Sequence, residues 1–163
     1  MTLAFVAIGS NLGDRLLNIA EARRRLDLLG ARTSGPIIET DAVLAPGDRF
    51  PQPRYLNTVD AIETRLSLDG FFAALRSAEV QMGRQRSERW APRNIDLDLL
   101  LFGDETRATE ELTLPHPRMH ERDFVMRPLR AVAAQLPLPR GEGWGEGARP
   151  QSAHRDGVTR RRE

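Results

Sequence analysis

The pattern of apolar and polar residues predicts alternating strands and helices over the first 134 residues. Short apolar runs and period-two alternation favour strands, whereas apolar residues that recur every three or four positions favour helices. The expected strands are residues 3–9, 31–40, 55–65 and 94–102, and the expected helices are about 14–29, 69–82 and 124–134. A short extended segment at 112–117 and a helical turn at 118–123 precede the last helix. The order β-α-β-β-α-β predicts an α+β, ferredoxin-like core with a C-terminal helical addition.

Two segments stand apart from this pattern. Residues 41–54 form a loop with three prolines, and a connection of this length is usually functional or disordered. After residue 134 the chain is rich in glycine, proline and arginine and can bury little apolar surface. We therefore expect one domain over residues 1–134 and a disordered tail over 135–163. We also expect the last helix to begin near or just before Pro128, because proline suits a first helical turn.

The last predicted strand carries two carboxylates. Asp96 and Asp98 are two residues apart, so their side chains are expected to share one face of the strand. The side chains expected on the opposite face, in the core, are Leu97, Leu99 and Leu101. Two carboxylates on an open face favour a bound cation, and Mg²⁺ takes one or two carboxylates and leaves its other positions to water and phosphates. The arginine-rich residues 84–93 suit phosphate oxygens. The alternative is a surface strand with two solvated acids beside a solvated loop.

The composition excludes several kinds of site. The 163-residue chain has no cysteine, which excludes disulfides and thiolate metal ligands. All 24 basic residues are arginine, so a P-loop lysine and a Schiff-base lysine are also excluded. The net charge of +1 gives no case for a nucleic-acid partner. No apolar run approaches the roughly 18 residues of a membrane span, and no signal-peptide pattern is present, so we expect a cytoplasmic protein without a membrane partner.

Three smaller features are open to two interpretations. Tyr55 and Asn57 share a strand face and could stack a flat ring and read its edge, although cross-strand packing explains them equally well. Gly9-Ser10-Asn11 resembles a phosphate cradle, but a plain strand-to-helix turn is the commoner explanation. His116 lies between two prolines in a stiff, extended segment, where a structural role is the commoner one.

These motifs together resemble one enzyme family. Arg89-Trp-Ala-Pro-Arg-Asn-Ile-Asp-Leu-Asp-Leu-Leu100, together with Gly9-Ser10-Asn11, Tyr55-Leu56-Asn57 and Pro115-His116, is similar to the 6-hydroxymethyl-7,8-dihydropterin pyrophosphokinases. The resemblance covers about residues 1–134. It implies a ferredoxin-like fold and the transfer of diphosphate from the co-substrate ATP to the pterin hydroxymethyl group, which leaves AMP, in folate biosynthesis.

The resemblance also implies roles for individual residues. Asp96 and Asp98 match the carboxylates that bind two Mg²⁺ ions, and together with Arg86 and Arg93 they are the expected catalytic residues. The expected pterin contacts are Thr40, the backbone near Val43, Tyr55, Asn57 and Phe124. The expected ATP contacts are Glu79, Arg86, Trp90, Arg93, Thr113, His116 and Arg122.

The resemblance is not complete. Asp41 follows Thr40 where the family usually has proline, Arg76 stands where a glutamine is often seen, and Glu111 stands where an arginine is common. We expect a monomer. The alternatives are a catalytically impaired member of the family and a non-catalytic, ferredoxin-like RNA-binding module, which would use Tyr55, Phe124 and the arginine-rich loop.

Overall fold

The apolar runs of the sequence form an antiparallel sheet. The computed structural model of the chain describes residues 1–43, 52–83 and 92–137. Its sheet strands are β1 (Thr2–Ser10), β2 (Ala31–Thr33), β3 (Ile38–Thr40), β4 (Tyr55–Thr64) and β5 (Asp96–Phe102). β1 lies between β4 and β5, and both β2 and β3 pair with the free edge of β4, so the order is β2-β4-β1-β5. Every pairing is antiparallel.

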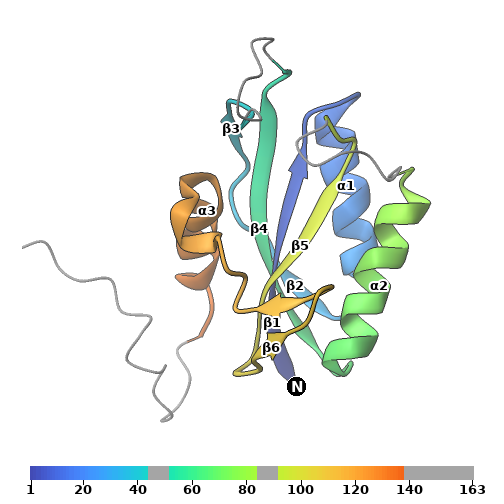
Figure 1. Cartoon of the computed structure of the whole chain (residues 1–163), viewed down its shortest axis with the longest axis vertical. Coiled ribbons are helices and arrows are strands. Elements are labelled where there is room, and N and C mark those ends of the chain that lie inside the picture. Colours follow the sequence, from blue (N-terminus) through green and yellow to red (C-terminus); the bar gives the residue numbers. More distant parts are fainter. Residues whose placement is uncertain (44–51, 84–91, 138–163) are drawn as a thin grey trace, which may run out of the picture.

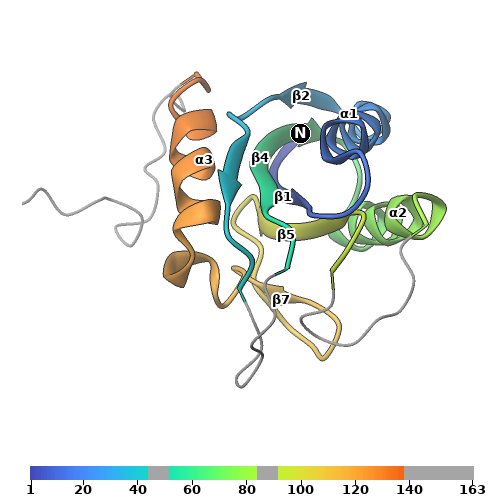
Figure 2. The same cartoon turned by 90° about the horizontal axis from the view of Figure 1, so that it is seen from above.

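Three helices cover the two faces of this sheet. The helices are α1 (Arg15–Leu26), α2 (Leu68–Gln81) and α3 (Asp123–Ala133). α1 and α2 lie together against one face, and α3 lies against the other (Figures 1 and 2). A separate two-stranded ribbon, β6 (Arg107–Ala108) and β7 (Thr113–Leu114), and a 3-10 turn, η1 (Met119–Glu121), lead from β5 to α3. The protein is therefore an α+β fold, and none of its described helices is long and apolar enough to cross a membrane.

Side-chain alternation on the strands builds one apolar core on each face. On β4, Ile62 packs in the core under α1 and α2, whereas Val59 and Ala61 pack in the core under α3. This confirms the alternation predicted from the sequence. In the larger core, the rings of Phe71 and Phe102 meet with their centroids 5.5 Å apart.

The predicted second strand, residues 31–40, is wrong as a single element. It divides into β2 and β3 because the backbone groups of Gly35 bond to side chains instead of to the backbone of β4. The Gly35 N–H donates to Asp60 Oδ1 (3.1 Å), and its carbonyl accepts from Arg23 Nη2 (2.9 Å). A Cβ at Gly35 would lie 2.2 Å from the carbonyl oxygen of Val59, so this crossing also requires glycine.

Two further predictions need correction. α3 spans Asp123–Ala133, close to the predicted range 124–134, but Pro128 lies inside the helix, where it is buried, and not in its first turn. Its ring is buried at the cost of a helical hydrogen bond. The register between β1 and β5 shifts after Leu99, so Leu100 is an extra residue opposite β1. Leu97 and Leu99 face the α1–α2 core as predicted, but after this bulge Leu101 packs on the α3 side.

A buried carboxylate connects α1, the β2–β3 link and β4. Asp60 is completely buried, and its two oxygens accept from Arg23 Nε and Nη2, both at 2.9 Å. Arg32 Nη1 donates to the same carboxylate at 3.1 Å. With the Gly35 N–H added, the carboxylate has two cationic partners and a backbone donor, which offsets its burial.

Replacing Asp60 with alanine should lower the free energy of unfolding by about 3 kcal/mol, because two arginines would lose their shared buried partner. Urea denaturation measures the loss. The control Asp69→Ala breaks an exposed ion pair with Arg107 (3.0 Å), which should cost less than about 1 kcal/mol. Equal losses in the two variants would contradict the role of Asp60.

Candidate active site

The site lies where β1 ends between two strands with polar side chains. Gly9 of β1 is paired with Asn57 of β4 on one side and with Asp96 of β5 on the other. Two residues earlier in β1, Ala7 is paired with Asp98 of β5. These residues share the α3 face of the sheet. Because Gly9 and Ala7 have little or no side chain, a hollow opens between the polar residues of β4 and those of β5.

Gly9 must stay small for this hollow to exist. A Cβ on Gly9 would lie 3.1 Å from Asn57 Oδ1 and 3.7 Å from Tyr55 Cδ1. The contact with Asn57 is tighter than an ordinary van der Waals contact, so a larger residue would press against both side chains. The sequence therefore places glycine where the polar walls approach the backbone of β1.

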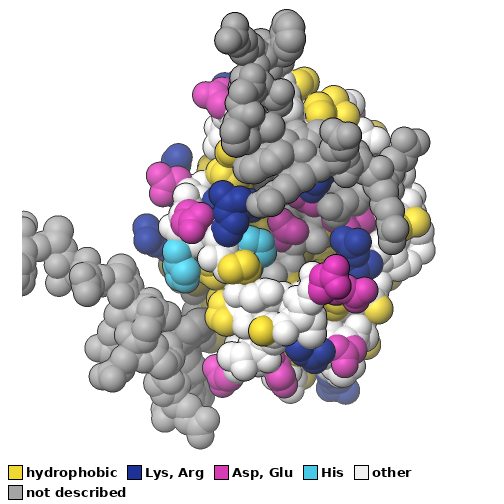
Figure 3. Space-filling view, viewed as in Figure 1, with side chains coloured by type: hydrophobic (Ala, Val, Ile, Leu, Met, Phe, Trp, Pro, Cys, Tyr) yellow, Lys and Arg dark blue, Asp and Glu magenta, His cyan; other side chains and the backbone are white. Residues whose placement is uncertain are grey.

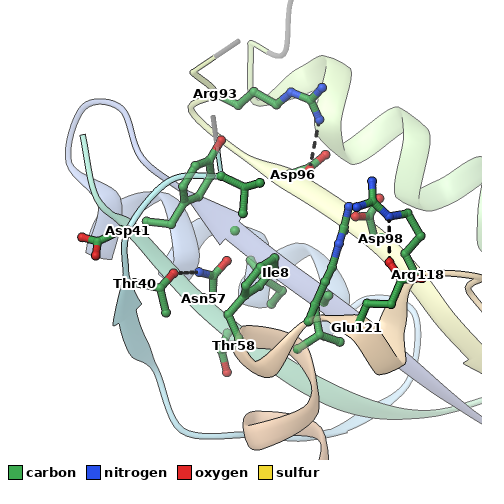
Figure 4. Close-up of a pocket in the computed structure, with 17 residues that line it drawn as sticks. Ile8, Thr40, Asp41, Asn57, Thr58, Arg93, Asp96, Asp98, Arg118 and Glu121 are labelled. Carbon is green, nitrogen blue, oxygen red and sulfur yellow. Dashed lines mark hydrogen bonds and ion pairs between the residues drawn. The ribbon is translucent and has the colours of Figure 1, made fainter. Parts of the chain in front are cut away.

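The hollow is a pocket of about 310 Å³ that is closed on its far side by η1 and the start of α3 (Figure 4). Nine of the residues predicted for the site line it: Thr40, Val43, Tyr55, Asn57, Arg93, Asp96, Asp98, Arg122 and Phe124. Basic, acidic and histidine side chains gather on the face of the molecule between α3 and α2 (Figure 3). The structure thus brings together most of the residues that the sequence singled out.

One wall of the pocket combines aromatic rings with an amide. Asn57 is almost fully buried, and its Nδ2 donates to Thr40 Oγ1 at 2.8 Å (Figure 4). Tyr55 and Phe124 line the same pocket from β4 and from α3. Burial, together with the charge of Asp96, raises the pKa of Tyr55 although Arg93 opposes this, so its hydroxyl stays protonated at neutral pH. The wall offers flat apolar surface and a polar edge.

The other wall carries opposite charges. Arg93 Nη1 lies 3.1 Å from Asp96 Oδ2, and Asp98 lies two residues further along β5 on the same face (Figure 4). No group of three His, Cys, Asp or Glu side chains that could hold a metal occurs among the described residues. Two carboxylates beside an arginine still suit Mg²⁺, which keeps coordination positions for water and phosphate oxygens. The donor set therefore fits a metal bound jointly with a phosphate ligand.

A smaller pocket of about 220 Å³ adjoins the first, because Asp98 lines both. Thr113 and His116, two of the predicted ATP contacts, lie in this second pocket. The N–H of His116 donates to the Leu100 carbonyl at 2.9 Å, which holds the segment against β5. The N–H of Arg118 donates to His116 Nδ1 at 3.2 Å, so the ring proton lies on Nε2. Nε2 is therefore the hydrogen-bond donor that this ring offers.

Of the three remaining predicted residues, the structure describes only Glu79, which lies outside these pockets. Glu79 is buried on α2, where its Oε1 accepts from the Leu97 N–H (2.8 Å) and its Oε2 from Arg76 Nη1 (3.3 Å). It lines neither pocket, and it holds the start of β5 from the α2 side of the sheet. Arg86 and Trp90 lie outside the described residues.

Sequence reasoning missed two pocket residues at η1, one directly before it and one at its end. Arg118 and Glu121 line the larger pocket, and Arg118 Nε lies 3.3 Å from Glu121 Oε2 (Figure 4). Their spacing of three residues within the predicted turn 118–123 was the available signal, because such residues share one side of a helical turn. They extend the charged wall towards α3.

A comparison with known families identifies the family of this chain. The family described as 7,8-dihydro-6-hydroxymethylpterin-pyrophosphokinase (HPPK) matches residues 5–134. The chain belongs to this family. The match includes the described residues of both pockets.

Individual HPPK relatives cover most of the chain. The 2-amino-4-hydroxy-6-hydroxymethyldihydropteridine pyrophosphokinase of Bacillus subtilis is 39% identical over 137 residues, which are 82% of this chain and 80% of the relative. The protein of the same name from Haemophilus influenzae is 37% identical over 147 residues, 87% of this chain and 88% of the relative. The mitochondrial folate synthesis bifunctional protein of Pisum sativum is 42% identical over 127 residues, 76% of this chain but 24% of that protein.

His116 should make the stability of this HPPK protein depend on pH. Burial, followed by the charge of Arg122, lowers the pKa of His116 below 6.5. The unfolded chain therefore binds the proton more readily than the folded protein. We expect the stability gained from a neutral His116 to be present above pH 6.5 and to be lost as pH falls through the lower folded pKa.

The measurement is the difference in unfolding free energy between the wild type and His116→Gln from pH 7.5 to pH 5 at about half-unit steps. Glutamine does not titrate, so the unfolding free energy of the wild type should fall relative to that of the variant as pH falls. A constant difference across this range would show that the folded environment does not disfavour the imidazolium of His116.

Proposed function

We propose that the chain transfers diphosphate from ATP to the hydroxymethyl group of 6-hydroxymethyl-7,8-dihydropterin, giving AMP, in folate biosynthesis. Its membership of the HPPK family supports this activity, as do the names of its relatives. The observation that carries the proposal is one pocket with an aromatic–amide wall on β4 and a carboxylate–arginine wall on β5. These walls match the flat heterocycle and the phosphate chain of the two substrates.

The β4 wall holds the pterin in this proposal. Tyr55 and Phe124 stack on the ring faces, and Asn57 with Thr40 reads the polar edge, helped by the backbone near Val43. Asn57 donates to Thr40, so its position is fixed before the pterin arrives. A preformed amide lowers the entropy lost on binding.

The β5 wall holds the phosphates. Asp96 and Asp98 would hold two Mg²⁺ ions, and such ions neutralise charge on phosphate oxygens during an in-line displacement. Arg93 stabilises the negative charge from the protein side, and we propose the same for Arg122 and Arg86. The hydroxymethyl oxygen releases its proton to solvent and bonds to the β-phosphorus, and the bond from that phosphorus to the α,β-bridging oxygen breaks, so AMP leaves with this oxygen.

The nucleotide is proposed to extend from this wall into the adjoining pocket. Thr113 and His116 line that pocket, and His116 Nε2–H is the donor available to a phosphate oxygen. Trp90 completes the proposed set of ATP contacts, and Glu79, which lines neither pocket, supports them indirectly. Glu79 acts in this scheme through the backbone of Leu97, which it holds from the α2 side.

The finer features of the protein belong to the same proposal. The strand order β2-β4-β1-β5, with two helices on one face, supports a ferredoxin-like core. We propose a single pyrophosphokinase domain over residues 1–134 and a monomer that works in the cytoplasm without nucleic-acid or membrane partners. Of the tail predicted over 135–163, Leu136 still packs against the core under α3, and residues 138–163 lie outside the described part of the chain. The carboxylates of Asp96 and Asp98 argue against an RNA-binding surface, because they would repel a phosphate backbone.

The activity is tested by incubating the protein with ATP, Mg²⁺ and 6-hydroxymethyl-7,8-dihydropterin and separating the nucleotides. AMP should form in step with the pterin diphosphate, and removal of Mg²⁺ with EDTA should stop the reaction. Formation of ADP would refute diphosphate transfer. Binding of both substrates without turnover would indicate a catalytically impaired relative, and Mg²⁺-independent, salt-dependent binding of oligonucleotides would favour an RNA-binding module.

Asp98→Asn should lower the rate of AMP formation by more than about tenfold, which is about 1.4 kcal/mol of barrier, because an amide holds Mg²⁺ less well than a carboxylate. The fold should remain intact by circular dichroism. The control is Asp104→Asn, which removes an exposed carboxylate just beyond the other end of β5. Activity of Asp98→Asn within tenfold of the control would refute the metal assignment.

A further inference from the structure

Asn11 is a buried amide at the end of β1 that lines neither pocket. It is 1% exposed, although it lies in a turn between a strand and a helix. Its Oδ1 accepts from the N–H of Arg93 at 2.8 Å, and its own N–H donates to the Arg93 carbonyl at 3.1 Å. Its Nδ2 donates to the carbonyl of Pro53 at 3.1 Å. One residue thus bonds to two segments that are 40 residues apart along the chain.

These two segments lead into the two walls of the pocket. Pro53 precedes Tyr55, the first residue of β4, and Arg93 precedes Asp96, the first residue of β5. β4 and β5 are not neighbours in the sheet, because β1 lies between them. Beyond the ends of the strands, no ladder of backbone hydrogen bonds among the described residues sets their separation. The amide of Asn11 spans this gap with an acceptor on one side and a donor on the other.

The side chain of Asn18 also bonds to the turn after β1, but it differs from Asn11 in the segments that it reaches. Its Nδ2 lies within hydrogen-bond distance of Ser10 Oγ, the Leu12 carbonyl and the Asn94 carbonyl. These contacts attach the turn to the segment before β5, and none of the three reaches the segment before β4. Asn11 differs because its two ends meet different walls of the site.

We propose that Asn11 is a positioning residue for diphosphate transfer, which fixes Arg93 on the phosphate wall relative to Tyr55 on the pterin wall. This inference rests on the proposed function. Transfer requires the attacking oxygen and the phosphorus to be aligned, and a misplacement of about 1 Å costs on the order of a hundredfold in rate. Loss of the Asn11 bridge should therefore lower kcat while each substrate still binds to its own wall.

The substitution Asn11→Asp separates the two halves of the bridge. Aspartate keeps an oxygen that accepts from the Arg93 N–H, but it presents a second oxygen to the Pro53 carbonyl, where two acceptors repel. We expect kcat for AMP formation to fall about 10- to 100-fold. The dissociation constants of the pterin alone, and of a non-hydrolysable ATP analogue with Mg²⁺, should each change by less than about threefold, because each wall keeps its own contacts.

Amide hydrogen exchange tests the bridge without relying on activity. In Asn11→Asp the exchange of residues 54–57 should become faster, while the N–H of Arg93 stays protected by the remaining acceptor. In Asn11→Ala both regions should lose protection. Unchanged exchange of residues 54–57 in both variants would overturn the bridge itself.

The stability control is Thr64→Val, at the opposite end of β4. Thr64 is 1% exposed like Asn11, and its hydroxyl donates to the Leu29 carbonyl at 2.6 Å and accepts from the Leu66 N–H at 3.1 Å. This variant should lose thermal stability but keep the wild-type kcat below its Tm. An equal loss of kcat in Thr64→Val, or a wild-type kcat in Asn11→Asp, would overturn the positioning role. If the wild-type chain forms no AMP, the proposed function is wrong, and so is the proposed effect of Asn11 on diphosphate transfer. The amide hydrogen exchange of residues 54–57 tests the Asn11 bridge in either case.

Discussion

The candidate site depends on the missing side chain at Gly9. Gly9 is paired with Asn57 and with Asp96, so these two polar residues face each other across a backbone with no Cβ. A Cβ would lie 3.1 Å from Asn57 Oδ1. On the same face of β1, Phe5 packs in the core under α3, and Ala7 lies between this core and the pocket. The side chains on this face of β1 therefore become smaller from Phe5 to Ala7 to Gly9. The strand that organises the core thereby also leaves room for a ligand.

The turn after β1 serves a second purpose. Ser10 and Asn11 are buried, and their side chains bond within the protein, which agrees with a strand-to-helix turn and leaves little of a phosphate cradle. Buried amides require partners, and Asn11 finds them in the segments that lead into β4 and β5. The chain thus satisfies the polar groups of a tight turn with the backbone of the loops that flank the pocket.

Local periodicity predicted the parts of the site that depend on one strand. Asp96 and Asp98 share a face because of the period of two, and so do Tyr55 and Asn57. The same rule failed for Leu101, because the bulge at Leu100 arises from pairing with β1 and has no local signal. It failed at Gly35 because Asp60 and Arg23, which take up its backbone groups, are distant in the sequence. The resemblance to a family assigned Glu79 to ATP, whereas only tertiary structure reveals that its carboxylate holds the Leu97 N–H.

The two walls of the pocket require different surroundings, and β1 keeps them apart. The β4 wall carries no charged side chain and its amide is satisfied within the protein, so it tolerates burial. The β5 wall concentrates charge and needs an arginine and, in our proposal, a cation. Placing such walls on adjacent strands would bring the carboxylates against the aromatic slot. One intervening strand with small residues separates them by two strand spacings, about 10 Å, which leaves space for a ring and a phosphate side by side.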